Sequence, residues 1–170
     1  MYKCNLFMSD FFEKQISNYC GLHALQNLFC NKNITPEHLN QIATNIAKES
    51  GDKIQNHAHT TGFWSFETLR RFVESQQNLT TFNHISQTNN SRSWVQHRRQ
   101  DCIGYILHLP QQQHYVCARW THNNFLQYVD SRNNGPILTT LPTIKNQCKN
   151  NKWNIFGVYG IPPTSSTSSG

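Results

Sequence analysis

The sequence predicts an α+β domain in which N-terminal helices pack on a largely antiparallel sheet. Up to about residue 79, apolar side chains recur every three or four positions, the spacing of helices that bury one face. Beyond that point the pattern changes to short runs with the two-residue period of strands, bounded by Asn, Gln, Pro or Gly. Helices followed by strands, rather than alternating with them, are typical of the α+β class.

The helices can be placed from their apolar spacing and their end signals. Residues 19–29 put Cys20 at a helix start and carry four apolar side chains at the helical period: Leu22, Leu25, Leu28 and Phe29. A second helix is predicted over residues 36–50, because it follows an N-cap threonine, begins with proline and ends before a glycine. Residues 51–62 are polar without a period and predict a mobile loop, and a third helix follows from Ser65.

Five strands are predicted from the two-residue period, at residues 79–85, 102–109, 114–120, 125–130 and 153–159. Short helices near residues 93–99 and 141–150 interrupt them. With 170 residues, 36% hydrophobic and 12% aromatic, the chain can fill one core, so we expect a single domain over residues 1–161. Residues 162–170 consist of Pro, Thr, Ser and Gly, and we expect this tail to be disordered.

The charge pattern and the cysteines limit the partners and the compartment. A net charge of +6 would suit nucleic acid if it were clustered, but the basic residues are scattered and do not alternate with aromatic ones. No segment approaches the ~20 apolar residues of a membrane span. Six cysteines without a CxxC pair favour a reduced, intracellular protein. We therefore expect a cytoplasmic or nuclear monomer that binds neither nucleic acid nor membrane.

Cys20 is the residue on which the functional prediction depends. The nucleophilic form of cysteine is the thiolate, and a free thiol with a pKa of about 8.5 is only a few per cent ionised near neutrality. The N–H groups and dipole at a helix start favour negative charge, and a neighbouring imidazolium favours it more. Cys20 has the right place for such a nucleophile, although a cysteine in a helix is more often a small buried residue.

Gln15 stands five residues before Cys20, a separation from which its side-chain amide can fold back beside the thiol. Together with the backbone N–H of Cys20, this amide would form an oxyanion hole for the tetrahedral intermediate of acyl transfer. Without such a neighbour, Gln15 would be an ordinary surface residue.

His114 is the predicted base among nine histidines, because it opens a strand whose hairpin returns with a carboxylate at its end. If three residues, 121–123, connect the two strands, Asp130 lies directly opposite His114 with its Cβ about 5 Å away on the same face. With four residues, 121–124, it falls on the other face. We predict the odd connection, in which Asp130 orients the ring and stabilises the imidazolium.

The stretch from Glu13 through Gln15 and Cys20 to Leu28 contains the run His23-Ala-Leu-Gln-Asn. Gly-Phe-Trp-Ser-Phe follows at residues 62–66, then the strand opened by His114, and then Tyr-Val-Asp-Ser at residues 128–131. In this order and spacing, over about residues 11–161, the chain resembles the Josephin family of deubiquitinases. The opening stretch matches that family's catalytic start position by position.

The resemblance implies a papain-like Josephin domain, of the compact type that consists of this domain only. Its activity would be that of a thiol protease on isopeptide or peptide bonds at the C-terminus of ubiquitin, with ubiquitin and its conjugates as partners. Because two terminal glycines can thread a narrow cleft, we expect Trp64, Phe63 and Tyr115 to line it. The tail of ubiquitin is basic, so an acidic patch, for example at Glu67, would have to compensate for the positive chain.

Two other interpretations use the same residues. One is a papain-like protease or acyltransferase that acts on a different acyl group, and the other is a catalytically inactive ubiquitin-binding module. A zinc site at Cys20 and His23, or at His57 and His59, lacks further ligands at usable spacing. We therefore expect neither a metal nor a cofactor.

Overall fold

The computed structural model of the chain describes residues 11–84 and 101–160. These residues form a six-stranded sheet in the order β1-β6-β2-β3-β4-β5, in which every neighbouring pair is antiparallel. The strands are β1 (Leu79–His84), β2 (Cys102–Leu109), β3 (His114–Trp120), β4 (Leu126–Val129), β5 (Ile137–Thr139) and β6 (Asn154–Gly160). The predicted α+β class with an antiparallel sheet is therefore confirmed.

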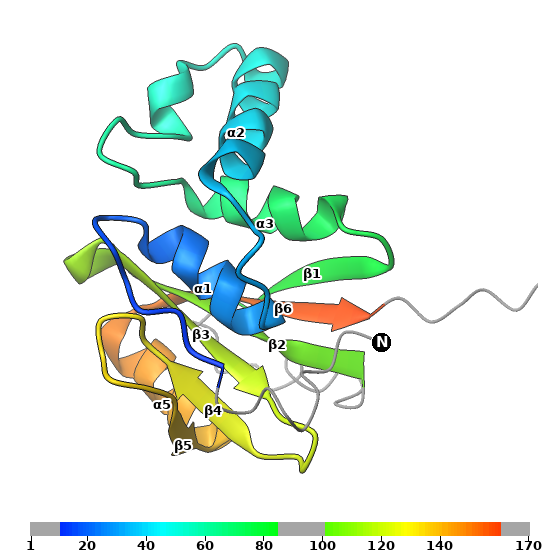
Figure 1. Cartoon of the computed structure of the whole chain (residues 1–170), viewed down its shortest axis with the longest axis vertical. Helices are drawn as coiled ribbons and strands as arrows, with labels where there is room; N and C mark the ends of the chain where they lie inside the picture. The colour runs from blue at the N-terminus through cyan, green and yellow to red at the C-terminus, as the bar shows by residue number, and fades with distance from the viewer. Residues whose placement is uncertain (1–10, 85–100, 161–170) are drawn as a thin grey trace, which may run out of the picture.

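Helices cover both faces of the sheet (Figure 1). α1 (Cys20–Phe29) and α3 (Phe66–Ser75) share one hydrophobic core with side chains of β2, β3 and β6. α5 (Leu141–Asn151) packs on the other face through Ile144 and Cys148. α2 (Pro36–Ser50) packs on α3, farther from the sheet, and the short 3-10 turns η2 (Ile54–Asn56) and η4 (Pro110–Gln112) lie in the connections.

α1 is more deeply buried than its apolar stripe predicts. A stripe of four apolar side chains indicates one buried face, yet every residue of α1 except Phe29 is buried. The reason is that polar side chains on its other face, including His23 and Asn27, are covered by the segment that precedes the helix. The helix that carries Cys20 is therefore enclosed on nearly all sides.

Gly104 in β2 allows α1 to approach the sheet closely. A Cβ atom at this position would lie 2.3 Å from the carbonyl oxygen of Ala118 and 2.7 Å from the Leu28 methyl group Cδ1. Both distances are far shorter than van der Waals contact, so a side chain here would displace either β3 or α1. The distance between the helix of Cys20 and the strand of His114 thus depends on a glycine.

The predicted elements differ from the observed ones in a few places. α1, α2 and α3 begin where predicted, and β4 is shorter than the predicted strand at residues 125–130. β5 has no counterpart in the prediction, and the loop 51–62 contains η2 and is anchored by hydrogen bonds from His57 to Asp52 and Ser65. The helix predicted near residues 93–99 and the tail 162–170 lie outside the described residues.

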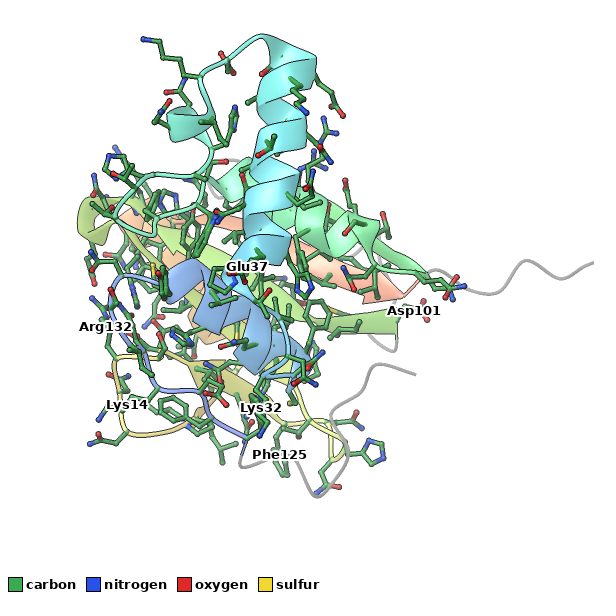
Figure 2. The ribbon with its side chains drawn as sticks, turned by 45° about the horizontal axis from the view of Figure 1, so that its top comes forward. Lys14, Lys32, Glu37, Asp101, Phe125 and Arg132 are labelled. Carbon is green, nitrogen blue, oxygen red and sulfur yellow. The ribbon has the colours of Figure 1, made fainter. Side chains whose placement is uncertain are left out.

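Charged side chains are spread over the surface rather than gathered in one patch. In Figure 2, Lys14 and Arg132 lie on one side of the molecule, and Lys32 lies away from them. On α3, Glu67 accepts hydrogen bonds from Arg70 and Arg71, which hold the pKa of its carboxyl below the ordinary value. Glu67 therefore does not supply the free negative charge expected of an acidic patch. Within residues 11–84 and 101–160, no helix has the length and apolarity that crossing a bilayer requires.

Candidate active site

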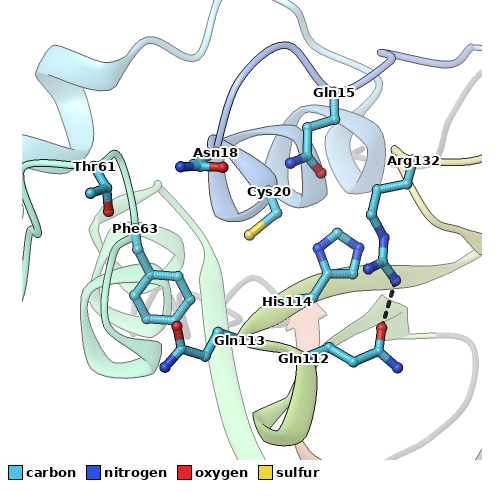
Figure 3. A pocket seen from close by; sticks show the side chains of 9 residues that line it. All are labelled: Gln15, Asn18, Cys20, Thr61, Phe63, Gln112, Gln113, His114 and Arg132. Atoms are coloured by element: carbon cyan, nitrogen blue, oxygen red, sulfur yellow. Dashed lines mark hydrogen bonds between the residues drawn. The ribbon is translucent and has the colours of Figure 1, made fainter.

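The predicted nucleophile and base line the same pocket, a cavity of about 270 Å³ (Figure 3). Four parts of the chain build it: the segment before α1 with the helix start, the loop before α3, the turn before β3 and the segment after β4. The lining residues are Gln15, Asn18, Cys20, Thr61, Phe63, Gln112, Gln113, His114 and Arg132. Cys20 and His114 belong to different elements and are 94 positions apart in the sequence, and the fold brings both to this pocket.

Cys20 is the first residue of α1 and is almost completely buried. Burial raises the pKa of its thiol, and this effect outweighs the backbone N–H groups of Tyr115, Gly21 and Cys20 and the charge of Arg132, all of which lower it. In the view of Figure 3 the sulfur is turned toward the side of Asn18 and Phe63. Within the described residues it makes no hydrogen bond to His114, so the thiol is neutral and unpaired with the base in this arrangement.

His114 and Asp130 form a buried pair. Nε2 of His114 lies 2.8 Å from Oδ1 of Asp130, and both side chains are less than a tenth exposed. Because a carboxylate only accepts hydrogen bonds, Nε2 carries the proton in this pair. Nδ1 makes no other hydrogen bond within the described part of the chain, and this leaves its lone pair free.

The hairpin register that brings this pair together differs slightly from the predicted one. Trp120 pairs with Leu126, so residues 121–125 connect the strands: the connection is odd, as predicted, but longer than the predicted 121–123. The ladder is shifted relative to the prediction, because Cys117 pairs with Val129. Continuing this register places Asp130 diagonal to His114 rather than directly opposite it, on the same face of the sheet. The prediction of direct opposition is therefore wrong, although the length of the His114 side chain bridges the offset.

Arg132, which the sequence did not single out, holds the other side of the Asp130 carboxylate. Its Nη2 donates to Oδ2 at 3.1 Å, and its backbone N–H donates to Oδ1 at 2.9 Å. Burial alone would raise the pKa of Asp130, but the hydrogen bonds from His114 and Arg132 outweigh it and hold that pKa well below the ordinary range. Asp130 is therefore a carboxylate at neutral pH.

Two hydrogen bonds orient the side-chain amide of Gln15 at the rim of the pocket, and a third holds its backbone. Its Nε2 donates to the carbonyl of Ser17 at 2.7 Å, and its Oε1 accepts from the Ser131 hydroxyl at 3.2 Å. Its backbone N–H donates to the carbonyl of Ser131 at 2.8 Å. An amide nitrogen has two N–H groups, so one remains for a ligand in the pocket.

Buried polar side chains hold the segment that carries Gln15, residues 11–16. Asn27 binds both backbone groups of Glu13, accepting from its N–H at 2.7 Å and donating to its carbonyl at 3.1 Å. Arg119 donates to the carbonyl of Phe11 at 2.6 Å, and His23 Nε2 accepts from the N–H of Ile16 at 3.3 Å. We call residues 11–16 the anchored segment. His23 thus has a structural contact here, to the backbone of Ile16.

The three aromatic residues expected to line the cleft take different places. Phe63 is partly exposed and lines the pocket, and its ring stacks on that of Tyr115 with centroids 5.2 Å apart. Tyr115 and Trp64 are buried in the core beneath it, only 1% and 2% exposed. Direct contact with a substrate is therefore open to Phe63, whereas Tyr115 and Trp64 support the wall from behind.

Gly62 lets the loop before α3 pass against Tyr19, the residue before Cys20. Its φ of +94° lies in the left-handed region, and a Cβ there would lie 2.5 Å from the Tyr19 ring. Tyr19 also packs against Trp64, with ring centroids 5.5 Å apart. The loop with Phe63 and the start of α1 are therefore in direct contact.

Metal chemistry has no support in this part of the structure. Over residues 11–84 and 101–160, no three side chains of His, Cys, Asp or Glu converge in a way that could hold an ion. The cysteines Cys20, Cys102, Cys117 and Cys148 are free and buried, and of these only Cys20 lines the pocket. What the site offers chemically is one thiol, one imidazole bound to a carboxylate, one guanidinium paired with that carboxylate, and amide donors.

Comparison with known proteins places the chain in a family. The chain is 26% identical over 169 residues to an Ataxin-3 homolog of Caenorhabditis briggsae, a match that covers 92% of this chain and 51% of that protein. It thus spans about half the length of that relative. A family model described as Josephin matches residues 15–159, which include Gln15, the helix of Cys20, the His114–Asp130 hairpin and nearly the whole sheet. Since this family model matches most of the chain, over a range that includes every residue at the pocket wall, the chain belongs to the Josephin family.

Proposed function

We propose that the chain is a cysteine-type deubiquitinase, which hydrolyses isopeptide or peptide bonds at the C-terminus of ubiquitin. The observation that carries this proposal is that the two ring nitrogens of His114 have different surroundings. Its Nε2 is committed to Asp130 inside the protein, while Nδ1 is left toward the pocket that Cys20 lines. An imidazole held in this tautomer is ready to take a proton from a thiol.

The proposed reaction begins with proton transfer from the thiol of Cys20 to Nδ1 of His114. The sulfur then attacks the carbonyl carbon, and the carbonyl oxygen becomes an oxyanion that accepts from the free N–H of Gln15 and the backbone N–H of Cys20. Collapse of this intermediate breaks the C–N bond, and the imidazolium gives its proton to the departing amine. Water, deprotonated by His114, hydrolyses the thioester to a carboxylate and restores the thiol.

The thiol needs a short movement before this chemistry. Burial raises the pKa of Cys20, so the neutral thiol prevails at neutral pH and a base must meet it directly. Rotation about the Cα–Cβ bond of Cys20, from one staggered rotamer to another, turns the sulfur toward His114. We propose that the substrate carbonyl favours this rotamer when it enters the pocket.

The pocket wall fits an extended, uncharged chain end. Besides the reacting groups, the lining consists of carboxamides, one hydroxyl, the Phe63 ring and Arg132, whose guanidinium is bound to Asp130 and Gln112. Carboxamides donate and accept, as a peptide backbone does, and a wall of this kind binds a backbone without requiring a charged side chain. We propose the two glycines that end ubiquitin as the occupant, ubiquitin and its conjugates as the partners, and an intracellular monomer as the working form.

Covalent capture by a ubiquitin probe tests the proposal. We expect ubiquitin vinyl sulfone to label the wild-type chain and to leave Cys20→Ala unlabelled. Cys102→Ala is the matched control, because Cys102 is a free buried cysteine away from the pocket, and it should still be labelled. A folded wild-type chain that reacts with small thiol reagents but not with this probe would contradict the ubiquitin assignment.

A further inference from the structure

The Asp130 carboxylate is bound by two residues, His114 and Arg132. Only the contact to His114 belongs to the pair described above. Oδ1 receives His114 Nε2 at 2.8 Å, and Oδ2 receives Arg132 Nη2 at 3.1 Å. Arg132 adds its backbone N–H at 2.9 Å and its Nε at 3.3 Å, both on Oδ1. A carboxylate held on two sides by one fork has little freedom to rotate. The position of Asp130 relative to the imidazole is therefore set by Arg132.

The same guanidinium also holds the turn that leads into His114. Arg132 Nη2 donates to Oε1 of Gln112 at 2.8 Å, a contact drawn in Figure 3. Gln112 ends η4, and Gln113, which separates it from His114, has a φ of +45°. Since a non-glycine residue in the left-handed region is conformationally costly, this turn benefits from an outside contact. Arg132 thus links the segment after β4 to the turn before β3, on the two sides of the imidazole.

Arg132 is also the permanent cation of the pocket. Of the nine lining residues it is the one with a fixed charge, and its side chain is 44% exposed. The titratable groups that face Cys20 are His114 and Tyr115 of β3 and Arg132, while the loop before α3 contributes the uncharged Thr61 and Phe63. Within this set the positive charge of Arg132 favours the thiolate, because opposite charges attract.

We propose that Arg132 is a positioning residue of the Cys20–His114 site, which fixes the Asp130 carboxylate and the turn before His114 and whose charge stabilises the Cys20 thiolate. This inference rests on the proposed function, because it assigns Arg132 to the same thiol chemistry. The two roles can be tested separately: the contacts of the Arg132 guanidinium to Asp130 and Gln112 support turnover, and its charge supports ionisation of Cys20.

The pH dependence of Cys20 alkylation isolates the role of the charge without any ubiquitin. The probe is iodoacetamide, and the extent of reaction at Cys20 is measured by mass spectrometry of its peptide across the pH range. Loss of a positive charge near a thiol disfavours the thiolate, so Arg132→Ala and Arg132→Gln should move the profile to higher pH by roughly half a unit or more. Arg132→Lys keeps the charge and should leave the profile near that of the wild type.

Turnover of ubiquitin with a fluorogenic C-terminal amide tests the geometry. We expect Arg132→Ala to lower kcat by about ten- to a hundredfold with little change in KM, the effect of a slightly misplaced base. Arg132→Lys should recover only part of this loss, since an ammonium cannot span Asp130 and Gln112 as a fork does. Arg71→Ala is the matched control, because Arg71 is similarly exposed at 42% and ion-paired, but lies on α3 and outside the pocket.

The possible outcomes separate this inference from the proposed function. A wild-type chain that fails to turn over the ubiquitin amide removes the proposed function, whereas the alkylation profiles still report on Arg132. Unshifted alkylation profiles in both Arg132→Ala and Arg132→Gln overturn the role of the charge. Wild-type kcat in Arg132→Ala overturns the positioning role.

Discussion

Neighbouring residues hold the side chain of Gln15, the proposed donor to the oxyanion, in one orientation. Its amide oxygen is bound by Ser131 and one amide hydrogen by the carbonyl of Ser17. These contacts fix the orientation of the amide and leave its second N–H free before any substrate arrives. A donor that is oriented in advance stabilises developing charge without a reorganisation cost.

Replacing Gln15 with alanine should therefore affect turnover more than binding. We expect Gln15→Ala to lower kcat by about a hundredfold or more, the usual effect of removing one oxyanion donor. Steady-state cleavage of the fluorogenic ubiquitin amide measures this change. Gln41→Ala is the control, since Gln41 is an exposed glutamine on α2 whose amide donates only to neighbouring Asn45. A near-normal kcat in Gln15→Ala would remove the oxyanion role.

Three residues of the candidate site could be predicted because each follows from a local pattern. A helix start positions Cys20, a strand start positions His114, and the odd hairpin connection puts Asp130 on the same face of the sheet. Arg132 could not be predicted in this way. Its importance comes from contacts to Asp130 and to Gln112, which is 20 positions away, and these depend on how the segment after β4 turns back.

At the scale of elements, the anchored segment explains why α1 is buried all round. A helix next to a sheet normally exposes its polar face to water. In α1 this face instead binds the backbone of residues 11–16, through the side chains of His23 and Asn27. The apolar spacing predicted where the helix begins, but it carries no information about polar side chains that bind a distant backbone. The full burial of α1 was therefore not predictable.

Asn27 is the residue through which this arrangement can be tested. In Asn27→Ala, the partly buried N–H and carbonyl of Glu13 lose their partners, so we expect the free energy of unfolding to fall by about 1–3 kcal/mol. Because Glu13 lies two residues before Gln15, kcat should fall as well. Urea unfolding and ubiquitin cleavage provide the two measurements.

Asn45→Ala is the comparison for this change, since Asn45 is an exposed asparagine on α2 that accepts a single hydrogen bond from Gln41. It should shift stability by less than about 0.5 kcal/mol. If Asn27→Ala were as stable and as active as Asn45→Ala, the anchored segment would not depend on Asn27.

At the scale of the whole molecule, the sequence predicted the class of the fold but not its strand order. β6 inserts between β1 and β2, a pairing that joins the end of the chain to its middle and leaves no local trace in the sequence. β5 escaped prediction because it is three residues long and lies at the sheet edge, with Ile137 and Leu138 exposed. Alternating burial, the signal by which a strand is recognised, is absent from it.

The buried Asp130 carboxylate makes the stability of the whole fold depend on pH. Its pKa is held below the ordinary carboxyl value, so its contribution is present above that value, near pH 4, and is lost as pH falls through the folded pKa. We expect acidification below about pH 4 to destabilise the wild type more than Asp130→Asn, with the difference changing by an amount on the order of 1–3 kcal/mol. Denaturant midpoints at several pH values measure it.

The matched variant for this prediction is Asp52→Asn. Asp52 also accepts a hydrogen bond from a histidine, His57, but its side chain is 50% exposed. Solvent weakens such a pair, so the stability of Asp52→Asn should follow the wild-type curve as pH falls. Curves for Asp130→Asn that ran parallel to the wild type would contradict the linkage.

The contact between Gly62 and Tyr19 has a mechanical consequence. Tyr19 precedes the nucleophile, and Phe63, next to Gly62, forms the pocket wall across from it. Pulling the wall outward to admit a bulkier chain end would take away the surface on which the Tyr19 ring rests. The width of the pocket entrance and the orientation of Cys20 are therefore coupled. A chain end narrow enough to leave Phe63 in place also leaves Tyr19, and with it Cys20, in position.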